Sequence, residues 1–209
     1  MPQKEHWDSV YATRASDHVS WFQAHAQLSL RLIGDTGAGK AARIIDVGGG
    51  AATLVDDLLD AGYVHLTVLD ISATALACAR ARLGSRGDDI AWIAGDITET
   101  RLPRASFDVW HDRAVFHFLT DAGSRRAYVA NALRAVRPGG HVIVSTFADD
   151  GPSRCSGLPV MRYRPEELHG EFGAAFELIG HRRENHLTPG GRLQKFVYCY
   201  CRIASGGAI

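Results

Sequence analysis

The sequence predicts an α/β fold: a doubly wound, mostly parallel seven-stranded sheet with one antiparallel strand and helices on both faces. Three observations lead to this prediction. Short apolar runs typical of strands alternate with helical patterns along the chain. An early run ends in the glycine cluster Gly48, Gly49 and Gly50, and a helical stretch follows it. The last two runs are joined by a short turn at residues 188–191, which permits only an antiparallel pair.

The length and composition favour one domain. The chain has 209 residues, which is enough for a single large core. Its 46% hydrophobic and 22% charged residues are typical of soluble globular proteins. We expect one domain over residues 1–209, with a leader and helix in residues 1–40 and the sheet in residues 41–209.

Charge and hydropathy argue against several classes of partner. Basic and acidic residues balance at 23 each, so the composition favours no nucleic-acid partner. No apolar run approaches the ~20 residues that span a bilayer, and the polar start of the chain does not resemble a signal peptide. We therefore expect a cytoplasmic protein without a membrane partner. The cysteines form no C-x-x-C pair and the histidines have no ligand spacing, so we predict no metal.

Each element is predicted from local patterns. A helix is expected over residues 17–33, because Ser16 or Asp17 can begin it and Gly34 can end it. The sheet strands are expected at residues 43–47, 65–70, 90–94, 107–111, 141–147, 176–186 and 193–203, with the reversed strand at the sheet edge. Further helices are expected at residues 52–61, 73–83 and 124–136, and another opens at Arg164–Pro165.

Two nucleotide motifs compete for the glycine-rich segments. Residues 34–41 (GDTGAGKA) approach a P-loop, but Ala41 replaces the hydroxyl that binds magnesium, and the segment runs from helix to strand instead of the reverse. The turn at Gly48 approaches the dinucleotide fingerprint G-x-G-x-x-G, but Thr53 stands at the third glycine. Asp70 ends the next strand and is placed to accept hydrogen bonds from a ribose diol, with helix capping as the alternative role.

Later features identify a known family. Asp96 ends the third strand, residues 137–140 (RPGG) precede the fifth, and a hairpin closes the chain. With the glycine turn, this ordered set resembles the class I S-adenosylmethionine-dependent methyltransferases, a seven-strand Rossmann-like family, from about Trp7 to Arg202. The resemblance implies an enzyme that uses S-adenosylmethionine and releases S-adenosylhomocysteine.

The resemblance also implies the residues that bind this cofactor. Asp46, Gly48, Gly49 and Gly50 would line its methionine end. Asp70 would hold the ribose hydroxyls. The adenine pocket would be formed by Ile71, Asp96 and Ile97.

The N-terminal segment is similar to the leader of some small methyltransferases. Trp7-Asp8-x-x-Tyr11 resembles a leader motif of protein-lysine methyltransferases, and Trp21 follows it. Aromatic faces stabilise a sulfonium cation by roughly 0.5–2 kcal/mol each. We expect Trp7, Tyr11 and Trp21 to cover the cofactor, with packing of the leader onto the sheet as the alternative.

The end of the fourth strand supplies the catalytic candidates, because ligands bind at the carboxyl ends of strands in such folds. The exit Asp112-Arg113-Ala114 resembles the D-K-G or D-R-G exit of protein-lysine and thiopurine methyltransferases, with Ala114 in place of glycine. We predict that Asp112 orients or deprotonates the acceptor, with His111 or His117 as the alternative base. A structural role is the other interpretation of His117.

The acceptor is predicted from what the chain lacks. It has no extra domain or large insertion for substrate recognition, which favours a small molecule with a sulfur, metalloid or nitrogen nucleophile. A protein lysine is the second prediction, and a non-catalytic protein that binds S-adenosylmethionine is the third. The loop at residues 148–163, which contains Cys155, is a candidate lid. We expect a monomer or a weak homodimer.

Overall fold

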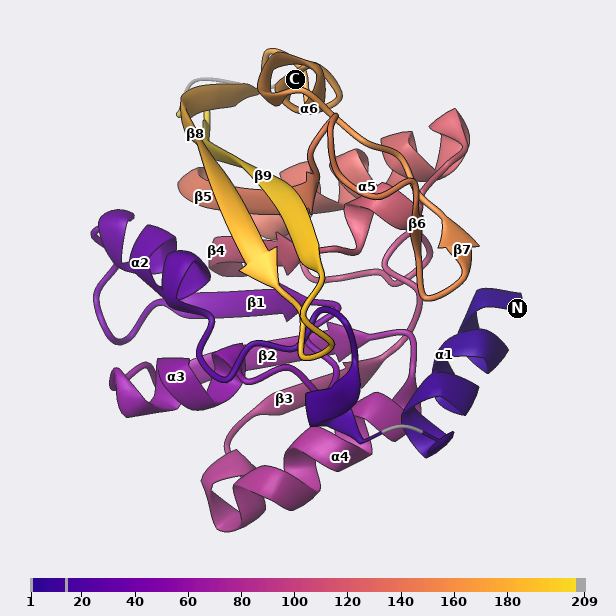
Figure 1. The fold of residues 1–209 in the computed structure, drawn as a ribbon. Coiled ribbons are helices and arrows are strands. Elements are labelled where there is room, and N and C mark those ends of the chain that lie inside the picture. The colour runs from indigo at the N-terminus through magenta and orange to yellow at the C-terminus, as the bar shows by residue number, and fades with distance from the viewer. Residues whose placement is uncertain (1, 14, 206–209) are drawn as a thin grey trace.

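A computed structural model describes residues 2–13 and 15–205. Its centre is a seven-stranded sheet in the order β3-β2-β1-β4-β5-β9-β8 (Figure 1). The strands of this sheet are β1 (Arg43–Val47), β2 (His65–Asp70), β3 (Ala91–Ala94), β4 (Phe107–Arg113), β5 (Val136–Phe147), β8 (Phe176–Leu187) and β9 (Leu193–Ile203). The helices are α1 (Pro2–Thr13), α2 (Gln27–Asp35), α3 (Leu54–Asp60), α4 (Ala73–Leu83), α5 (Ala122–Ala135) and α6 (Pro165–Gly170).

The pairing of the strands confirms the predicted fold class. Strands β3, β2, β1, β4 and β5 are parallel neighbours. Strand β9 runs antiparallel to both β5 and β8. The reversed strand is therefore β9, and its predicted place at the sheet edge is wrong. The apolar β9 is buried almost throughout, whereas β8 carries Arg182, Arg183 and Glu184, and charged side chains suit an edge strand.

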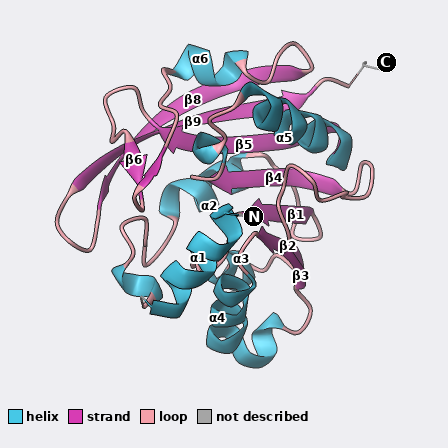
Figure 2. Cartoon of the chain, turned by 90° about the vertical axis from the view of Figure 1, so that its right-hand side faces the viewer, coloured by secondary structure: helices cyan, strands magenta, loops and turns pink. Residues whose placement is uncertain are grey.

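Two apolar cores cover the faces of the sheet. Side chains of α5 and α6 pack on one face, for example Tyr128 and Leu168 with Trp110. Side chains of α2, α3 and α4 pack on the other, for example Leu32 and Leu58. Figure 2 shows the strands stacked from β8 to β3, with helices around them. The carboxyl edge of the parallel strands is left for loops.

The N-terminal region differs from the predicted helix over residues 17–33. The structure has α1, a 3-10 turn at Ser16–His18, an irregular segment at residues 19–26, and then α2. Distant side chains hold this segment outside a helix. His186 donates from Nε2 to the Ser20 carbonyl, the Thr53 hydroxyl donates to the Gln23 carbonyl, and Asp57 accepts from the Ala26 amide. These tertiary hydrogen bonds replace the backbone bonds of a helix.

Smaller differences concern element ends. Strand β4 continues to Arg113, and β5 begins at Val136 instead of residue 141. The RPGG run therefore lies inside β5, where Gly139 adopts φ +74° next to a register shift between Phe107 and Val109. The loop at residues 148–163 contains a small hairpin that the sequence does not predict, β6 (Arg154–Cys155) and β7 (Leu158–Pro159). Within the described residues, every helix is too short or too polar to cross a membrane.

Candidate active site

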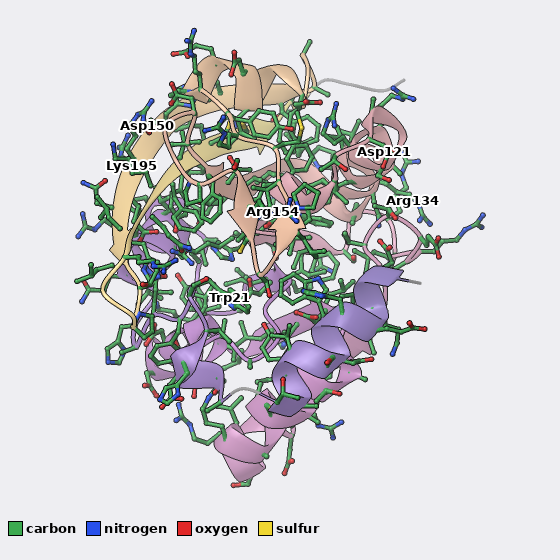
Figure 3. The ribbon with its side chains drawn as sticks, turned by 45° about the vertical axis from the view of Figure 1, so that its right-hand side comes forward. Trp21, Asp121, Arg134, Asp150, Arg154 and Lys195 are labelled. Carbon is green, nitrogen blue, oxygen red and sulfur yellow. The ribbon has the colours of Figure 1, made fainter. Side chains whose placement is uncertain are left out.

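Two adjoining cavities lie at the carboxyl edge of the parallel strands. They enclose about 760 and 560 Å³ of empty space, including their open mouths. Tyr11, Trp21, Gly48 and Arg113 line both of them. Figure 3 shows Trp21 below the β6–β7 hairpin, which carries Arg154, and beside α1. Cavities of this size at this edge of an open α/β sheet are typical of binding sites for cofactors and small molecules.

The glycine turn packs against two carboxylates. Gly48 has φ +71°, and a Cβ atom there would overlap the side chain of Val115. A Cβ atom on Gly49 would lie 2.5 Å from an Asp46 carboxylate oxygen, and one on Gly50 would lie 2.6 Å from Asp70 Oδ2. The three glycines are therefore required by the protein itself, and they bring backbone and carboxylates together at the floor of the site.

Asp70 is a buried carboxylate with one oxygen available. Oδ1 accepts a 2.8 Å hydrogen bond from the Ser72 amide, and no donor among the described residues reaches Oδ2. Burial raises the pKa of Asp70 to about 7, and the hydrogen bond from the Ser72 amide opposes part of this rise in pKa. Asp70 lines the larger cavity. A buried acceptor of this kind is suited to a ligand that brings hydroxyl donors.

Asp96, Ile97 and Ile71 lie along the same cavity, at the ends of β3 and β2. Asp96 Oδ1 accepts from the Thr98 amide at 2.8 Å and from the Thr98 hydroxyl at 2.7 Å, which fixes the carboxylate in a turn. The three residues expected at an adenine pocket thus line one cavity, a carboxylate and two apolar side chains.

Four aromatic rings form the roof of the larger cavity. Trp7 packs edge-to-face on Trp21 and on Phe118, with ring centroids 5.5 and 5.1 Å apart. The Tyr11 and Trp21 ring centroids are 6.2 Å apart. Trp7 and Tyr11 belong to α1, which Asp8 ties to α4 by accepting a 2.6 Å hydrogen bond from the Ser72 hydroxyl. The three aromatic residues expected to cover the cofactor therefore lie together along the cavity, and Phe118 joins them.

His111 lies in a buried chain of hydrogen bonds beside the smaller cavity. Its Nδ1 is 2.7 Å from Asp46 Oδ1, and its Nε2 is 2.8 Å from the Ser29 hydroxyl. Both ring nitrogens are therefore engaged, so His111 orients Asp46 and is not a free base. Asp46 itself lines the smaller cavity with Gly48 and Gly49. Ser29 comes from α2, and no sequence signal pointed to it.

The structure does not support the predicted role of Asp112 as a base. The carboxylate is fully buried and accepts three hydrogen bonds, from the amides of Val115 and Phe116 and from the Tyr128 hydroxyl. Side chains alternate along β4, so His111 and Arg113 face the cavities while Asp112 faces α5. Burial raises the pKa of Asp112 to about 6, and the three donors act against that shift. Its place gives Asp112 a structural role in shaping the turn after β4.

His117 is also away from both cavities. Its Nδ1 accepts a 3.3 Å hydrogen bond from the Phe147 amide, and its ring packs against Phe118 and Phe147. Burial and the Arg113 charge lower the pKa of His117 to about 3, so the ring is neutral near pH 7. Its Nε2 has no partner among residues 2–13 and 15–205. These contacts support the structural interpretation of His117.

Arg113 connects the site to distant segments. It forms a 3.0 Å ion pair with Glu184 of β8, donates at 3.1 Å to the Tyr198 hydroxyl and at 3.2 Å to the Trp21 carbonyl. Glu184 also accepts a 2.9 Å hydrogen bond from Gln23. This largely buried clamp holds the 19–26 segment beside the cavities. In the sequence, Arg113 is distinguished only by its place in the exit of the fourth strand, and no local pattern points to Gln23 or Glu184.

Cys155 is the one thiol among the residues lining the larger cavity in the described chain. It lies on β6 and is buried, and burial raises the pKa of its thiol to about 12, opposed by the Arg113 charge. The thiol is therefore protonated near pH 7. No cluster of three or more His, Cys, Asp or Glu side chains in the described ranges is arranged to hold a metal ion.

Comparison with known proteins matches part of the chain to methyltransferases. Residues 44–140 match the family model of the methyltransferase domain. A ubiquinone/menaquinone biosynthesis C-methyltransferase from Methylobacterium nodulans is 35% identical over 109 residues, which are 51% of this chain and 42% of that protein. The eEF1A lysine and N-terminal methyltransferase of Mus musculus is 25% identical over 118 residues, 56% of this chain and 17% of that protein. The chain thus spans half or less of these relatives.

Solved structures extend the likeness to nearly the whole chain. The 1,6-didemethyltoxoflavin-N1-methyltransferase of Burkholderia thailandensis superposes with a TM-score of 0.73 and 21% identity, over 97% of this chain and 87% of that one. The N-methyltransferase NodS of Bradyrhizobium japonicum superposes with a TM-score of 0.71 and 18% identity, over 95% and 98% of the two chains. Residues 44–140 therefore match the methyltransferase-domain model, and the chain shares the Rossmann-like fold of these solved methyltransferases.

Proposed function

We propose that the protein transfers a methyl group from S-adenosylmethionine to a small-molecule nucleophile and releases S-adenosylhomocysteine. The observation that carries this proposal is the buried Asp70 carboxylate, whose Oδ2 has no donor among the described residues and lies beside the glycine turn in a cavity. A buried carboxylate is retained where a ligand supplies its missing hydrogen bonds.

The lining residues match the parts of this cofactor. Asp70 would accept from the ribose hydroxyls, and Asp96 would accept from the adenine amino group between Ile71 and Ile97. The methionine end would lie in the smaller cavity, against the glycine turn and the Asp46–His111 pair. The residues that line both cavities mark where the two halves of the cofactor would meet.

The cofactor supplies a methyl group already activated on a sulfonium. The chain contributes alignment and a site without bulk water. Trp7, Tyr11 and Trp21 would place aromatic faces near the cation, and Arg113 holds the Trp21 segment in position. Asp112, His111 and His117 are engaged in internal contacts, so we assign none of them to proton removal.

Small-molecule acceptors are favoured over a protein lysine. The quinone and toxoflavin methyltransferases named above act on small molecules, and the toxoflavin enzyme matches this chain at nearly full length. The lysine methyltransferase relative is matched over only 17% of its length. A protein substrate remains the alternative, supported by the Trp7–Tyr11 leader. A non-catalytic cofactor-binding protein is the third candidate. The cytoplasmic location and the monomer or weak homodimer stay predictions from the sequence.

Calorimetry with S-adenosylhomocysteine tests the donor site. We expect binding by the wild type and a loss of about tenfold or more in Asp70→Asn, since one good hydrogen bond to a charged group contributes roughly 1.5–3 kcal/mol. Ionised Asp70 is the better acceptor, and its pKa is raised to about 7. Wild-type affinity should therefore increase from pH 6 to pH 8, whereas the Asp70→Asn variant should show no such increase. Equal affinity of the two proteins would contradict the assignment.

The same variant carries a stability signature. Because the pKa of folded Asp70 lies above the unfolded value of 3.8, its ionisation costs folding free energy as pH rises through 7. Asp70→Asn should therefore be more stable than wild type at pH 8 and should lose this advantage below about pH 4. Urea unfolding at both pH values measures the difference.

Label transfer tests the activity. The protein is incubated with methyl-labelled S-adenosylmethionine and a cell extract separated into small-molecule, protein and RNA fractions. We expect label in the small-molecule fraction. Label in protein would support the lysine alternative. Binding of S-adenosylhomocysteine without any labelled fraction would support the non-catalytic one.

A further inference from the structure

We infer that the methyl acceptor is an uncharged, planar aromatic molecule that attacks through its own neutral lone pair, on nitrogen or sulfur, without a protein base. This inference rests on the proposed function and names the substrate class of the same site. It follows from which part of the larger cavity remains for the acceptor, from what forms its walls, and from which bases are missing there.

The strand order separates a donor half from an acceptor half. Asp70 and Asp96 stand at the ends of β2 and β3, on one side of the glycine turn after β1. Strand β4 lies on the other side of β1, and the β6–β7 hairpin follows β5 beyond it. The nucleoside would occupy the β2–β3 side. The space left for the acceptor is bounded by the β4 exit, the hairpin and α1.

The walls of this acceptor space are aromatic and apolar. Trp7, Trp21, Phe118, Ala114 and Cys155 line it. The Trp7 ring is edge-to-face with both Trp21 and Phe118, at interplanar angles of 83° and 76°. Rings held at such angles accept a further flat ring by stacking on one and meeting the edge of another.

The charge of the space disfavours an ionic acceptor. Arg113 is the one basic side chain among the described residues that line the larger cavity. Its guanidinium is already neutralised by Glu184 at 3.0 Å and bonded to the Tyr198 hydroxyl and the Trp21 carbonyl. An anionic acceptor would be desolvated there without a free cation. A protonated, cationic nitrogen would have no lone pair with which to attack the methyl group.

No described side chain in the acceptor space is available to remove a proton. The Cys155 thiol and the Tyr11 hydroxyl both have pKa values raised by burial, the first to about 12. Both groups are therefore protonated near pH 7. Asp112 and His117 lie outside the cavity walls, and His111 is held between Asp46 and Ser29. A hydroxyl acceptor would keep its proton in this site.

A neutral lone pair avoids that requirement. The nitrogen or sulfur forms a bond to the methyl carbon while the carbon–sulfur bond of the donor breaks. That electron pair stays on the donor sulfur, which gives neutral S-adenosylhomocysteine and moves the positive charge to the acceptor. The aromatic walls that receive the neutral ring also stabilise the cation that forms on it. An N–H acceptor loses its proton to water after transfer.

Binding of probe molecules to the protein–S-adenosylhomocysteine complex tests the inference without turnover. The probes are quinoline, 1-naphthol and 1-naphthoate, which share a bicyclic frame and differ in lone pair and charge. Tryptophan fluorescence reports binding, because Trp7 and Trp21 line the cavity while Trp92 and Trp110 do not. We expect quinoline to bind at least about tenfold tighter than 1-naphthoate.

Single variants locate the probe. Trp21→Phe should lose much of the quinoline-induced quenching and keep an aromatic wall. Trp92→Phe is the matched control and should keep the quenching, since Trp92 of β3 donates to the Gly87 carbonyl and does not line the cavity. Quenching that disappears in Trp92→Phe, or tighter binding of 1-naphthoate, would overturn the inference.

Methylation of the same probes completes the test. With S-adenosylmethionine, mass spectrometry should find N-methylquinolinium, and 1-naphthol should remain unmethylated at pH 7. Methylation of 1-naphthol, or bound quinoline that is not methylated, would refute the lone-pair requirement. If S-adenosylhomocysteine itself does not bind, the proposed function fails. If it binds and quinoline does not, the acceptor inference alone fails.

Discussion

Aspartates at the ends of strands have different roles in this protein. The difference lies in how many hydrogen bonds each carboxylate accepts from the protein. Asp70 accepts one hydrogen bond, from a backbone amide to Oδ1. Its Oδ2 has no donor among the described residues and faces the cavity. Asp112 accepts three hydrogen bonds, two from backbone amides and one from a tyrosine hydroxyl, and its side chain faces away from the cavity. Position at a strand end predicted both as site residues. Only the side of the strand and the count of donors separate a ligand acceptor from a structural cap.

Substitution of Asp112 tests this distinction. Asp112→Asn should lower the free energy of unfolding by about 1–3 kcal/mol, because an amide NH2 group cannot accept from both the Phe116 amide and the Tyr128 hydroxyl. Tyr128→Phe removes the hydrogen bond between the Tyr128 hydroxyl and Asp112, and residue 128 does not line the cavity. If Asp112 is structural, both variants should lower kcat/KM by similar and modest factors. Urea unfolding and steady-state kinetics on both variants measure this. A base would behave differently: Asp112→Asn alone would lose orders of magnitude, and its pH–rate profile would change shape.

Much of the site was predictable from residues because its local signals are strong. The glycine turn, Asp70 and Asp96 lie along one cavity, as the chain order of strand ends requires. Ser29, Gln23 and Glu184 were not predictable. Each reaches the site through a hydrogen bond to a residue at least 71 positions away, such as Ser29 with His111, and local spacing carries no information about such pairs.

At the scale of elements, prediction succeeded where local chemistry decides the ends. Helix α4 has the predicted bounds, because the Ser72 hydroxyl accepts from the Ala75 amide and Gly84 adopts φ +55°. The predicted helix over residues 17–33 failed because the Arg113–Glu184 clamp and three side-chain hydrogen bonds hold residues 20–26 in an irregular path. The edge strand β8 thus positions a segment of the active site.

Two glutamates of β8 offer a matched test of that role. Glu184→Gln leaves the Arg113 charge buried without its partner, so we expect the free energy of unfolding to fall by roughly 3 kcal/mol or more. Glu177 pairs with Arg202 in an exposed position on the same strand, and Glu177→Gln should change stability by at most about 1 kcal/mol. Because the clamp also holds Trp21, only Glu184→Gln should weaken binding of S-adenosylhomocysteine. Urea unfolding and calorimetry compare the variants. Equal losses of stability and affinity in the two variants would show that the Arg113–Glu184 pair does not position the site.

At the scale of the whole molecule, a rigid sheet carries a cover attached by few bonds. Helix α1 meets the body through two side-chain hydrogen bonds, Asp8–Ser72 and His6–Ser156 on the β6–β7 hairpin, and through packing of its Trp7 and Tyr11 rings on Trp21 and Phe118. Its Trp7 and Tyr11 rings lie on the cavity. Segments with few anchoring contacts open locally at low free-energy cost, whereas the paired strands beneath open only with the whole domain. The architecture therefore lets ligands enter without unfolding the sheet.

Hydrogen exchange with and without S-adenosylhomocysteine examines this cover directly. A ligand at 100 times its Kd opposes any opening that destroys its site by about 2.7 kcal/mol, which slows exchange about 100-fold. We therefore expect slower exchange in α1 and in residues 16–26. Helix α6 supplies the internal control, because its residues line neither cavity and its local opening leaves the site intact. If exchange in α1 is unchanged by the ligand, α1 does not cover the cofactor. Trp7 would then not form a wall of the acceptor space.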